Sequence, residues 1–207
     1  MSTPTITLHG TELSGHTHRV ELLLRMLDLP YRFVLAPAAV RGTPEFHKLN
    51  PLRQIPVLQD GELTLADSNA ILVYLAKRYA QGSQWLPEEP VPAAHVQRWL
   101  SIAAGEVMYG PAIARMIIQW NFPSELARAK KIAGLLLRFM DDHLNDRSFL
   151  AAEHATIADL ACYSYVAHAP EGGIPLGDYA SVLTWLRRVE ALPKFKAIPP
   201  SPIPVQA

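Results

Sequence analysis

The 207-residue chain lacks the features that would place it in a membrane or on nucleic acid. No uncharged apolar stretch approaches the roughly 20 residues that span a bilayer. The N-terminus has no basic region followed by an apolar run and a small-residue cleavage site. Nineteen basic and nineteen acidic residues balance to zero without a run of like charge, so nothing offers an electrostatic footprint for nucleic acid or an anionic membrane. A small neutral or zwitterionic partner fits this composition better.

Cysteine is scarce as well. The single cysteine, Cys162, has no partner for an internal disulfide, which is typical of a protein of the reducing cytoplasm. Internal repeats are absent, and the length suffices for two small domains that each bury a core. Proline, by contrast, is frequent, and it gathers in the tail from Pro199 to Pro204, where we expect a mobile or surface-draped end.

The first 80 residues alternate between strand-like and helix-like patterns. A strand is expected over 5–9, followed by a helix whose inner face holds Val20, Leu23, Leu24 and Leu27. A second strand over 31–35 leads to a short helix that is capped by Thr43 and ends near Asn50. A hairpin of 57–58 and 63–65 around Asp60-Gly61 comes next, and a closing helix buries Ile71, Leu72, Leu75 and Tyr79. The predicted order is therefore βαβαββα, with the first two strands parallel.

A polar, proline-rich stretch over 81–92 predicts a linker. The sequence beyond it has helical periodicity and no strand signal. Gly110-Pro111 is expected to break or kink a helix, and Thr156-Ile157-Ala158-Asp159 has the spacing of a capping box before a buried helix. We interpret that box as structural, with a contribution on the order of 1 kcal/mol.

The stretch Gln54-Ile55-Pro56-Val57-Leu58 predicts an edge that binds a peptide. Because Pro56 cannot donate to a sheet ladder, it belongs at the entrance or edge of its strand, where a cis bond would turn the N–H and C=O of Ile55 outward toward an extended peptide. Eleven residues later, Asp67-Ser68 opens an apolar-periodic segment. A hydroxyl and free N–H groups at a helix start suit a carboxylate. One feature thus holds a peptide backbone and the other an acid terminus.

These residues resemble the glutathione transferase family, whose thioredoxin-like half carries this Ile-Pro turn and an acidic-residue-Ser pair at the next helix. The family also has a Ser/Thr-Ile-Ala-Asp cap where this chain has Thr156 to Asp159, so the resemblance covers nearly the whole chain. It implies a two-domain α+β fold: a thioredoxin-like, glutathione-binding domain over 1–80, the linker over 81–92, and an all-helical domain over 93–207 with the electrophile pocket.

The resemblance also implies how glutathione binds. Ser68 would hold the γ-glutamyl carboxylate, Asp67 would lie near the α-amino group, and Ile55-Pro56 would present its backbone to the cysteinyl residue. Gln54 stands where the family often has Lys or Gln and would reach the glycine carboxylate, with Arg53 as a cationic substitute. Alternatively, Ser68 is an ordinary N-cap, Asp67 serves only the helix start, and Gln54 is a solvated residue. The loop before Gln54 lacks the glycine of the family's Asn-Pro-x-Gly-Lys pattern.

Glutathione chemistry requires a thiolate, although a free thiol with a pKa of about 8.5 is mostly protonated at neutral pH. A hydroxyl that donates to sulfur at the positive end of a helix would lower that pKa. Ser14 precedes Arg19-Val20 much as the serine of serine-type members precedes their Arg-Val pair. Thr11 and Thr17 are rivals, and in the structural alternative Ser14 only satisfies a turn. The loop has no cysteine, so a cysteine-type mechanism is disfavoured. The family's tyrosine position holds Leu8-His9-Gly10, so a tyrosine-type mechanism is disfavoured as well.

Two further groups of residues invite a role. His16 and His18 form a His-x-His pair that can ligate metal, but without acidic or cysteine partners we expect no metal. A histidine near the thiol could instead add positive charge or contact a substrate, or both could be solvated. For the electrophile, candidates in the helical half are Met108, Tyr109, Arg115 and Trp120. Each has core packing as its alternative, and Arg115 predicts an anionic co-substrate only if it faces the pocket.

The sequence thus predicts a cytoplasmic, homodimeric glutathione transferase that ionises glutathione and directs the thiolate at a small, mainly apolar electrophile. One alternative is a protein of the same fold that binds ligands or partners without turnover. Another is a glutathione-dependent isomerase or dehalogenase, although the Ser-Ser-Cys loop of the maleylacetoacetate isomerase class is replaced by Ser14-Gly15-His16.

Overall fold

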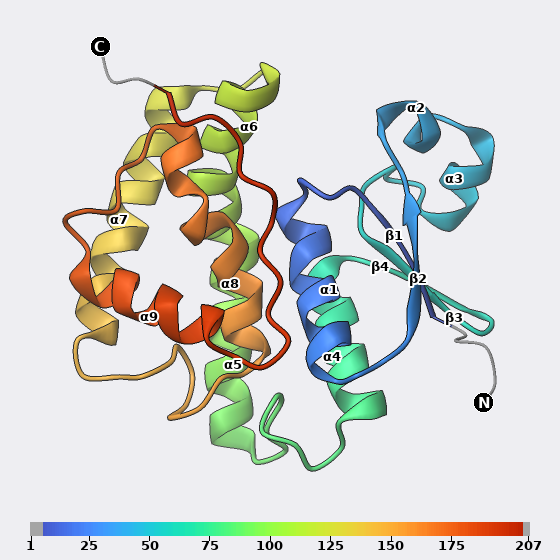
Figure 1. Cartoon of the computed structure of the whole chain (residues 1–207), viewed down its shortest axis with the longest axis horizontal. Coiled ribbons are helices and arrows are strands. Elements are labelled where there is room, and N and C mark those ends of the chain that lie inside the picture. The colour runs from blue at the N-terminus through green and yellow to red at the C-terminus, as the bar shows by residue number, and fades with distance from the viewer. Residues whose placement is uncertain (1–5, 205–207) are drawn as a thin grey trace.

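The computed structural model of the protein describes residues 6–204 and places a mixed β-sheet with its helices beside an all-helical half (Figure 1). The first half contains β1 (Ile6–Gly10), α1 (Gly15–Met26), β2 (Tyr31–Leu35), α2 (Ala38–Arg41), α3 (Pro44–Leu49), β3 (Val57–Asp60), β4 (Leu63–Ala66) and α4 (Ser68–Tyr79). The strand order is β2-β1-β3-β4, and only the β1–β2 pair is parallel. The predicted βαβαββα order is confirmed, with the short helix α2 as an unpredicted addition.

Local sequence signals account for most of these boundaries. The first predicted strand starts at Thr5, which lies outside the described residues, and β1 extends one residue past the predicted end to Gly10. Helix α3 begins after Thr43, whose hydroxyl accepts the Phe46 N–H at 3.2 Å. Pro44 sits in its first turn, where a missing N–H costs nothing.

The start of α4 contradicts the alternative in which Ser68 is the N-cap of the helix. The N-cap is Asp67, whose carboxylate accepts the N–H groups of Asn69 and Ala70 at 2.9 Å each, so Ser68 is the first helical residue and not the cap. Asp67 has a φ of +72°, in the left-handed region. The Ile55-Pro56 bond is cis, as the strand-entrance argument anticipated.

The second half contains α5 (Pro90–Ile102), the π-helix η1 (Ala103–Ala112), α6 (Ile113–Trp120), α7 (Leu126–Leu144), α8 (Ile157–Ala167), the 3-10 helix η2 (Ala169–Gly172) and α9 (Ala180–Glu190). Within residues 6–204 no strand follows β4. Helix α5 begins inside the stretch predicted as linker, and the exact domain limits stay a prediction. No helix in the described part of the chain has the length and apolar character to cross a membrane.

Gly110-Pro111 does not end its helix. The chain passes from α5 through the wider turns of η1 into α6, and Pro111 lies inside the π-helical segment. A π-helical turn is one of the known ways in which a helix accommodates an irregularity, and it often marks a functional site. A side chain at Gly110 would come within 3.0 Å of the backbone of Ala133, so glycine lets α7 approach closely here.

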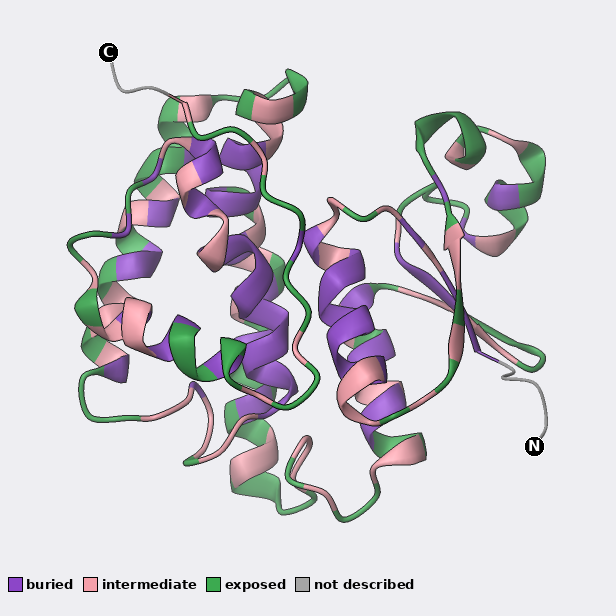
Figure 2. Ribbon diagram, in the orientation of Figure 1, coloured by how far each residue is buried: buried purple, intermediate pink, exposed green. Residues whose placement is uncertain are grey.

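Helices α1 and α4 lie between the sheet and the helical half, where α1 packs on α8 (Figure 1). Figure 2 shows the buried residues concentrated along this contact and through α8. The C-terminal segment, residues 191–204, returns beside α1. There the Lys196 carbonyl contacts the His18 ring at 2.6 Å, and the Ser201 N–H donates to Glu171 at 2.9 Å. The tail is therefore draped over the surface, one of the two expectations for it.

Candidate active site

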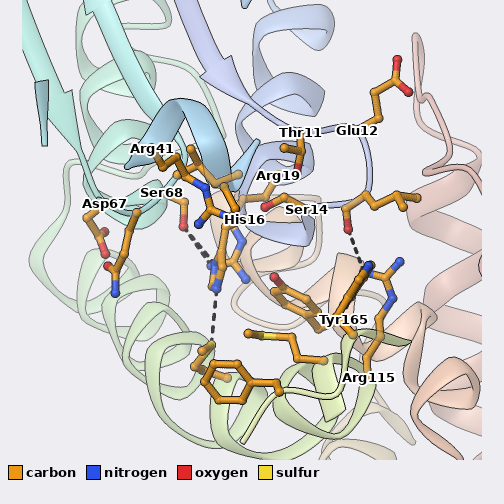
Figure 3. A pocket seen from close by; sticks show the side chains of 18 of the residues that line it. Thr11, Glu12, Ser14, His16, Arg19, Arg41, Asp67, Ser68, Arg115 and Tyr165 are labelled. Atoms are coloured by element: carbon orange, nitrogen blue, oxygen red, sulfur yellow. Dashed lines mark hydrogen bonds between the residues drawn. The ribbon is translucent and has the colours of Figure 1, made fainter. Parts of the chain in front are cut away.

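A cavity of about 910 Å³ opens between the two halves (Figure 3). It gathers most of the predicted site residues from separate parts of the chain: Ser14, Gln54, Ile55, Asp67, Ser68, Met108, Tyr109, Arg115 and Trp120. Pro56 is buried behind Ile55 and does not line the cavity. Residues that the sequence reasoning missed also line it, among them Leu35, Arg41, Tyr165 and Arg19.

Ser14 caps α1 and faces this cavity. The Thr17 N–H donates to its Oγ at 3.2 Å, so the hydroxyl keeps its hydrogen for another acceptor. Ser14 thus satisfies a backbone donor at a helix start, as the structural interpretation expected, and this role does not exclude a chemical one. Of the rival hydroxyls, Thr11 lines the cavity, whereas Thr17 is buried against Gly10 and does not.

Ser68 lies at the start of α4, within reach of two side chains from α1. Arg19 donates from Nη1 to Ser68 Oγ at 3.3 Å and to Asn69 Oδ1 at 3.0 Å. The Nδ1 atom of His16 lies 3.4 Å from the same Ser68 oxygen, as the dashed line in Figure 3 shows. Helices α1 and α4 therefore present the Ser68 hydroxyl, the Ser68 backbone N–H and a guanidinium to one part of the cavity, while the next three N–H groups of α4 donate to Asp67.

Arg19 is 1% exposed, and its Nε and Nη2 atoms have no hydrogen-bond partner among the described residues. Burial lowers the pKa of Arg19 from its usual value, and the nearby Tyr165, Cys162 and Asp67 oppose that effect. An arginine nevertheless remains protonated in a protein. The cavity wall consequently holds a permanent positive charge that has spare donors.

His16 and His18 occupy different surroundings. Burial, followed by the charge of Arg19, lowers the pKa of His16 to about 3, so the expectation that it adds positive charge is not supported at neutral pH. His18 does not line the cavity; its Nδ1 lies 2.9 Å from Ser164 Oγ. The two rings thus face different partners, and no group of three or more potential metal ligands occurs within residues 6–204.

Arg115 lies at the cavity wall, but its charge is already paired. Its Nε donates to Glu171, its Nη1 to the Leu13 carbonyl at 2.7 Å, and its Nη2 to Ser201 Oγ at 3.2 Å. Burial by itself would raise the pKa of Glu171, yet hydrogen bonds from the Ser201 N–H, His168 and Arg115 lower it overall. Because Glu171 neutralises its charge, Arg115 does not predict an anionic co-substrate. Its hydrogen bond to the Leu13 carbonyl instead holds the loop beside Ser14.

The opposite side of the cavity is mostly apolar. Met108 and Tyr109 come from η1 and Trp120 from α6, all in the helical half. Tyr109 and Trp120 are 60% and 48% exposed, which places them at the open side and not in the core. Fold and site together define a thioredoxin-like protein with a helical half, whose cavity suits an acidic peptide thiol on one side and an apolar molecule on the other.

Comparisons with known proteins agree with this description. Residues 8–84 match the family described as Glutathione S-transferase, N-terminal domain. Glutathione S-transferase 2 of Anopheles gambiae is 31% identical over 179 residues, which are 85% of this chain and 81% of that protein. The crystal structure of a glutathione S-transferase from Pseudomonas fluorescens is 31% identical, covers 94% of this chain and 98% of its own, and superposes with a TM-score of 0.87.

A second similar structure, a Drosophila glutathione transferase homologue with bound glutathione, is 25% identical, with a TM-score of 0.83 over 91% of this chain and 89% of its own. The chain therefore belongs to the cytosolic glutathione S-transferase family and is a glutathione transferase, as predicted. The alternatives without turnover or with isomerase or dehalogenase chemistry are not favoured.

Proposed function

We propose that this glutathione transferase ionises glutathione beside Ser14 and directs the thiolate at a small, mainly apolar electrophile. The observation that carries the proposal is the geometry of Ser14. Its oxygen accepts the Thr17 N–H, which leaves the hydroxyl able to donate its hydrogen, and it lines the cavity at the positive end of α1. A hydroxyl that donates to sulfur stabilises the thiolate and lowers the pKa of the thiol.

The tripeptide extends from Ser68 toward Gln54 in this proposal. Ser68 receives the γ-glutamyl carboxylate through its hydroxyl and its backbone N–H, Asp67 lies near the α-amino group, and the Ile55 backbone pairs with the cysteinyl residue. Gln54 reaches the glycine carboxylate, and Arg41 on α2 adds a cation at that end, because both line the cavity. The proposal is supported by the fact that all five residues line one cavity.

The electrophile lies against Met108, Tyr109 and Trp120. Their apolar surfaces offer no charged group, and the neighbouring Arg115 is neutralised by Glu171. Binding there places an apolar molecule next to the sulfur, so that both reactants are held in one encounter. We also infer a cytoplasmic homodimer. Family membership supports the dimer, and the single free cysteine, which is buried, supports a reducing compartment.

An ultraviolet difference titration with reduced glutathione tests the proposal, because the thiolate absorbs where the thiol does not. We expect a saturable thiolate signal at neutral pH, with a thiol pKa well below its free value. Ser14→Ala should raise that pKa while glutathione affinity stays largely intact, whereas Ser68→Ala should weaken affinity.

The matched control is Thr11→Ala, which removes the other hydroxyl that lines the cavity. If Thr11→Ala raises the thiol pKa and Ser14→Ala does not, Thr11 takes over the catalytic role. If glutathione binds without any thiolate signal, the mechanism itself is wrong.

A further inference from the structure

Tyr165 reaches the active site from the helical half. It lies on α8 and is 4% exposed, yet it lines the cavity together with Ser14. A Cβ atom at Gly15 would lie only 2.8 Å from Tyr165 Cζ, the carbon that carries the hydroxyl. The phenol end of the ring therefore sits on the first residue of α1, directly after Ser14.

The surroundings of the ring fix its orientation. The His16 ring meets it edge-on at a centroid distance of 4.9 Å, and the Arg19 guanidinium carbon lies 5.9 Å from its centroid. In Figure 3 the Tyr165 hydroxyl points toward Ser14 and into the cavity. Glycine at position 15 makes this approach possible, because any side chain there would collide with the ring.

We infer that the Tyr165 hydroxyl donates a second hydrogen bond to the glutathione sulfur, beside the one from Ser14. This inference rests on the proposed function, since it assumes that the sulfur lies beside Ser14. The thiolate is then held by one hydroxyl from each half of the molecule, and both donors are in place before glutathione arrives. The phenol O–H bond stays intact, so no proton is transferred.

The protonation state of Tyr165 agrees with a donor role. Burial raises the pKa of Tyr165, while the charges of Arg19 and Arg115 and hydrogen bonds from the His16 backbone N–H and the Ser14 hydroxyl act in the opposite direction without reversing the shift. The phenol consequently keeps its hydrogen at neutral pH. A neutral donor in a partly dry site favours the charged form of its acceptor, which here is the thiolate.

Tyr163, two residues earlier on the same helix, provides a matched control. It is also 4% exposed, but its hydroxyl donates to Glu190 at 2.9 Å and its ring faces Trp185 and Phe195. It does not line the cavity. Tyr163→Phe therefore removes one buried tyrosine hydroxyl from α8 without touching the thiol site.

The test is the thiolate titration of the wild type, Tyr165→Phe, Tyr163→Phe, Ser14→Ala and the double variant Ser14→Ala/Tyr165→Phe, each with a melting curve. We expect Tyr165→Phe to raise the pKa of bound glutathione by about one unit, in either background, and Tyr163→Phe to leave it unchanged. If Tyr165→Phe fails to fold, Tyr165→Leu removes the hydroxyl by another route and is measured in its place.

Three outcomes contradict the inference in distinguishable ways. If Ser14→Ala raises the thiol pKa and Tyr165→Phe does not, the inference fails and the proposed function stands. If Tyr165→Phe raises the pKa only while Ser14 is present, Tyr165 acts through Ser14 and does not touch the sulfur. If the wild type itself gives no thiolate signal, the proposed function fails, and this inference fails with it.

Discussion

Arg19 carries a buried charge that forms no ion pair with a carboxylate of the described residues, although Asp67 lies nearby. Its guanidinium donates to Ser68 and Asn69, and two of its nitrogen atoms have no partner within residues 6–204. An unpaired buried charge normally costs several kcal/mol. Such a cost is offset when an anion binds nearby, and the glutathione carboxylate or thiolate would serve as that anion. The unpaired charge of Arg19 therefore destabilises the free protein relative to its complex with glutathione.

Arg19→Met should therefore weaken glutathione binding at least about tenfold, because hydrogen bonds to a charged group contribute about 1.5–3 kcal/mol. The stability of the free protein should stay the same or rise, since an apolar side chain of similar length replaces an unpaired charge. Glutathione titration and a urea unfolding curve of the free variant measure the two effects separately.

Arg25→Met is the control for Arg19→Met, because Arg25 lies on the same helix and donates to the Lys194 carbonyl away from the cavity. It should leave glutathione affinity unchanged. A large loss of stability in free Arg19→Met, with affinity retained, would instead show that Arg19 is a structural tie between α1 and α4.

At the residue scale, sequence reasoning finds the groups that carry a local signal. Ser14 and Asp67 stand at helix starts, and Ile55 precedes a proline, so the pattern itself marks them. Arg19 was noted only as a marker of the helix, although a charge flanked by buried positions was a usable hint. Tyr165 has no such signal, because it lies in an apolar helix like any core residue and is brought to Ser14 only by the packing of α8 on α1.

At the scale of elements, the capping box of α8 does more than begin a helix. Asp159 is fully buried and accepts from the Thr156 N–H at 2.8 Å, the Leu150 N–H at 2.9 Å and the Trp185 indole N–H at 2.9 Å. The same carboxylate therefore ties together the loop before α8, the helix start and α9. The sequence predicted the box but not its reach, because Leu150 and Trp185 are distant partners.

Asp159→Ala should destabilise the protein by about 3–5 kcal/mol, since it leaves several buried donors unsatisfied. Thr156→Ala removes the acceptor for the Ala158 N–H and should cost only about 1 kcal/mol. Urea unfolding midpoints compare the two variants. Equal small losses would mean that Asp159 acts as an ordinary cap.

The long helix of the second half shows where local rules run out. Proline and glycine at 110–111 predict a break, and the break appears as the π-helical turns of η1. Gly110 also lies against the Ala133 backbone of α7, a tertiary contact that no local pattern predicts. Sequence patterns therefore predicted the place of the irregularity and not its form.

At the scale of the whole molecule, the halves meet along α1 and α8, and the C-terminal segment closes over the contact. His18 joins all three parts: it belongs to α1, its Nδ1 lies 2.9 Å from Ser164 of α8, and its Nε2 lies 2.6 Å from the Lys196 carbonyl of the tail. In the neutral ring, Nε2 donates to the carbonyl and Nδ1 accepts from the hydroxyl. The tail's role in this contact had no sequence signal, because a carbonyl is available at every residue.

The pH dependence of stability should reveal this junction. Burial lowers the pKa of His18 from 6.5 to about 4; the Lys196 carbonyl and Glu21 oppose that shift, and His168 and the Lys196 ammonium add to it. The unfolded chain thus takes up a proton that the folded chain resists, so stability is present above about pH 6.5 and falls as the pH drops. His18 alone should cost about 2 kcal/mol between pH 6.5 and about pH 5. Urea unfolding of the wild type and His18→Gln at both pH values measures this loss, because glutamine cannot take up the proton and should remove that part of the pH dependence of stability.

Lys196→Ala, which keeps the carbonyl but removes the ion pair with Glu21, should retain the same slope of stability against pH. Equal slopes in the wild type and His18→Gln would show that the buried ring does not resist protonation.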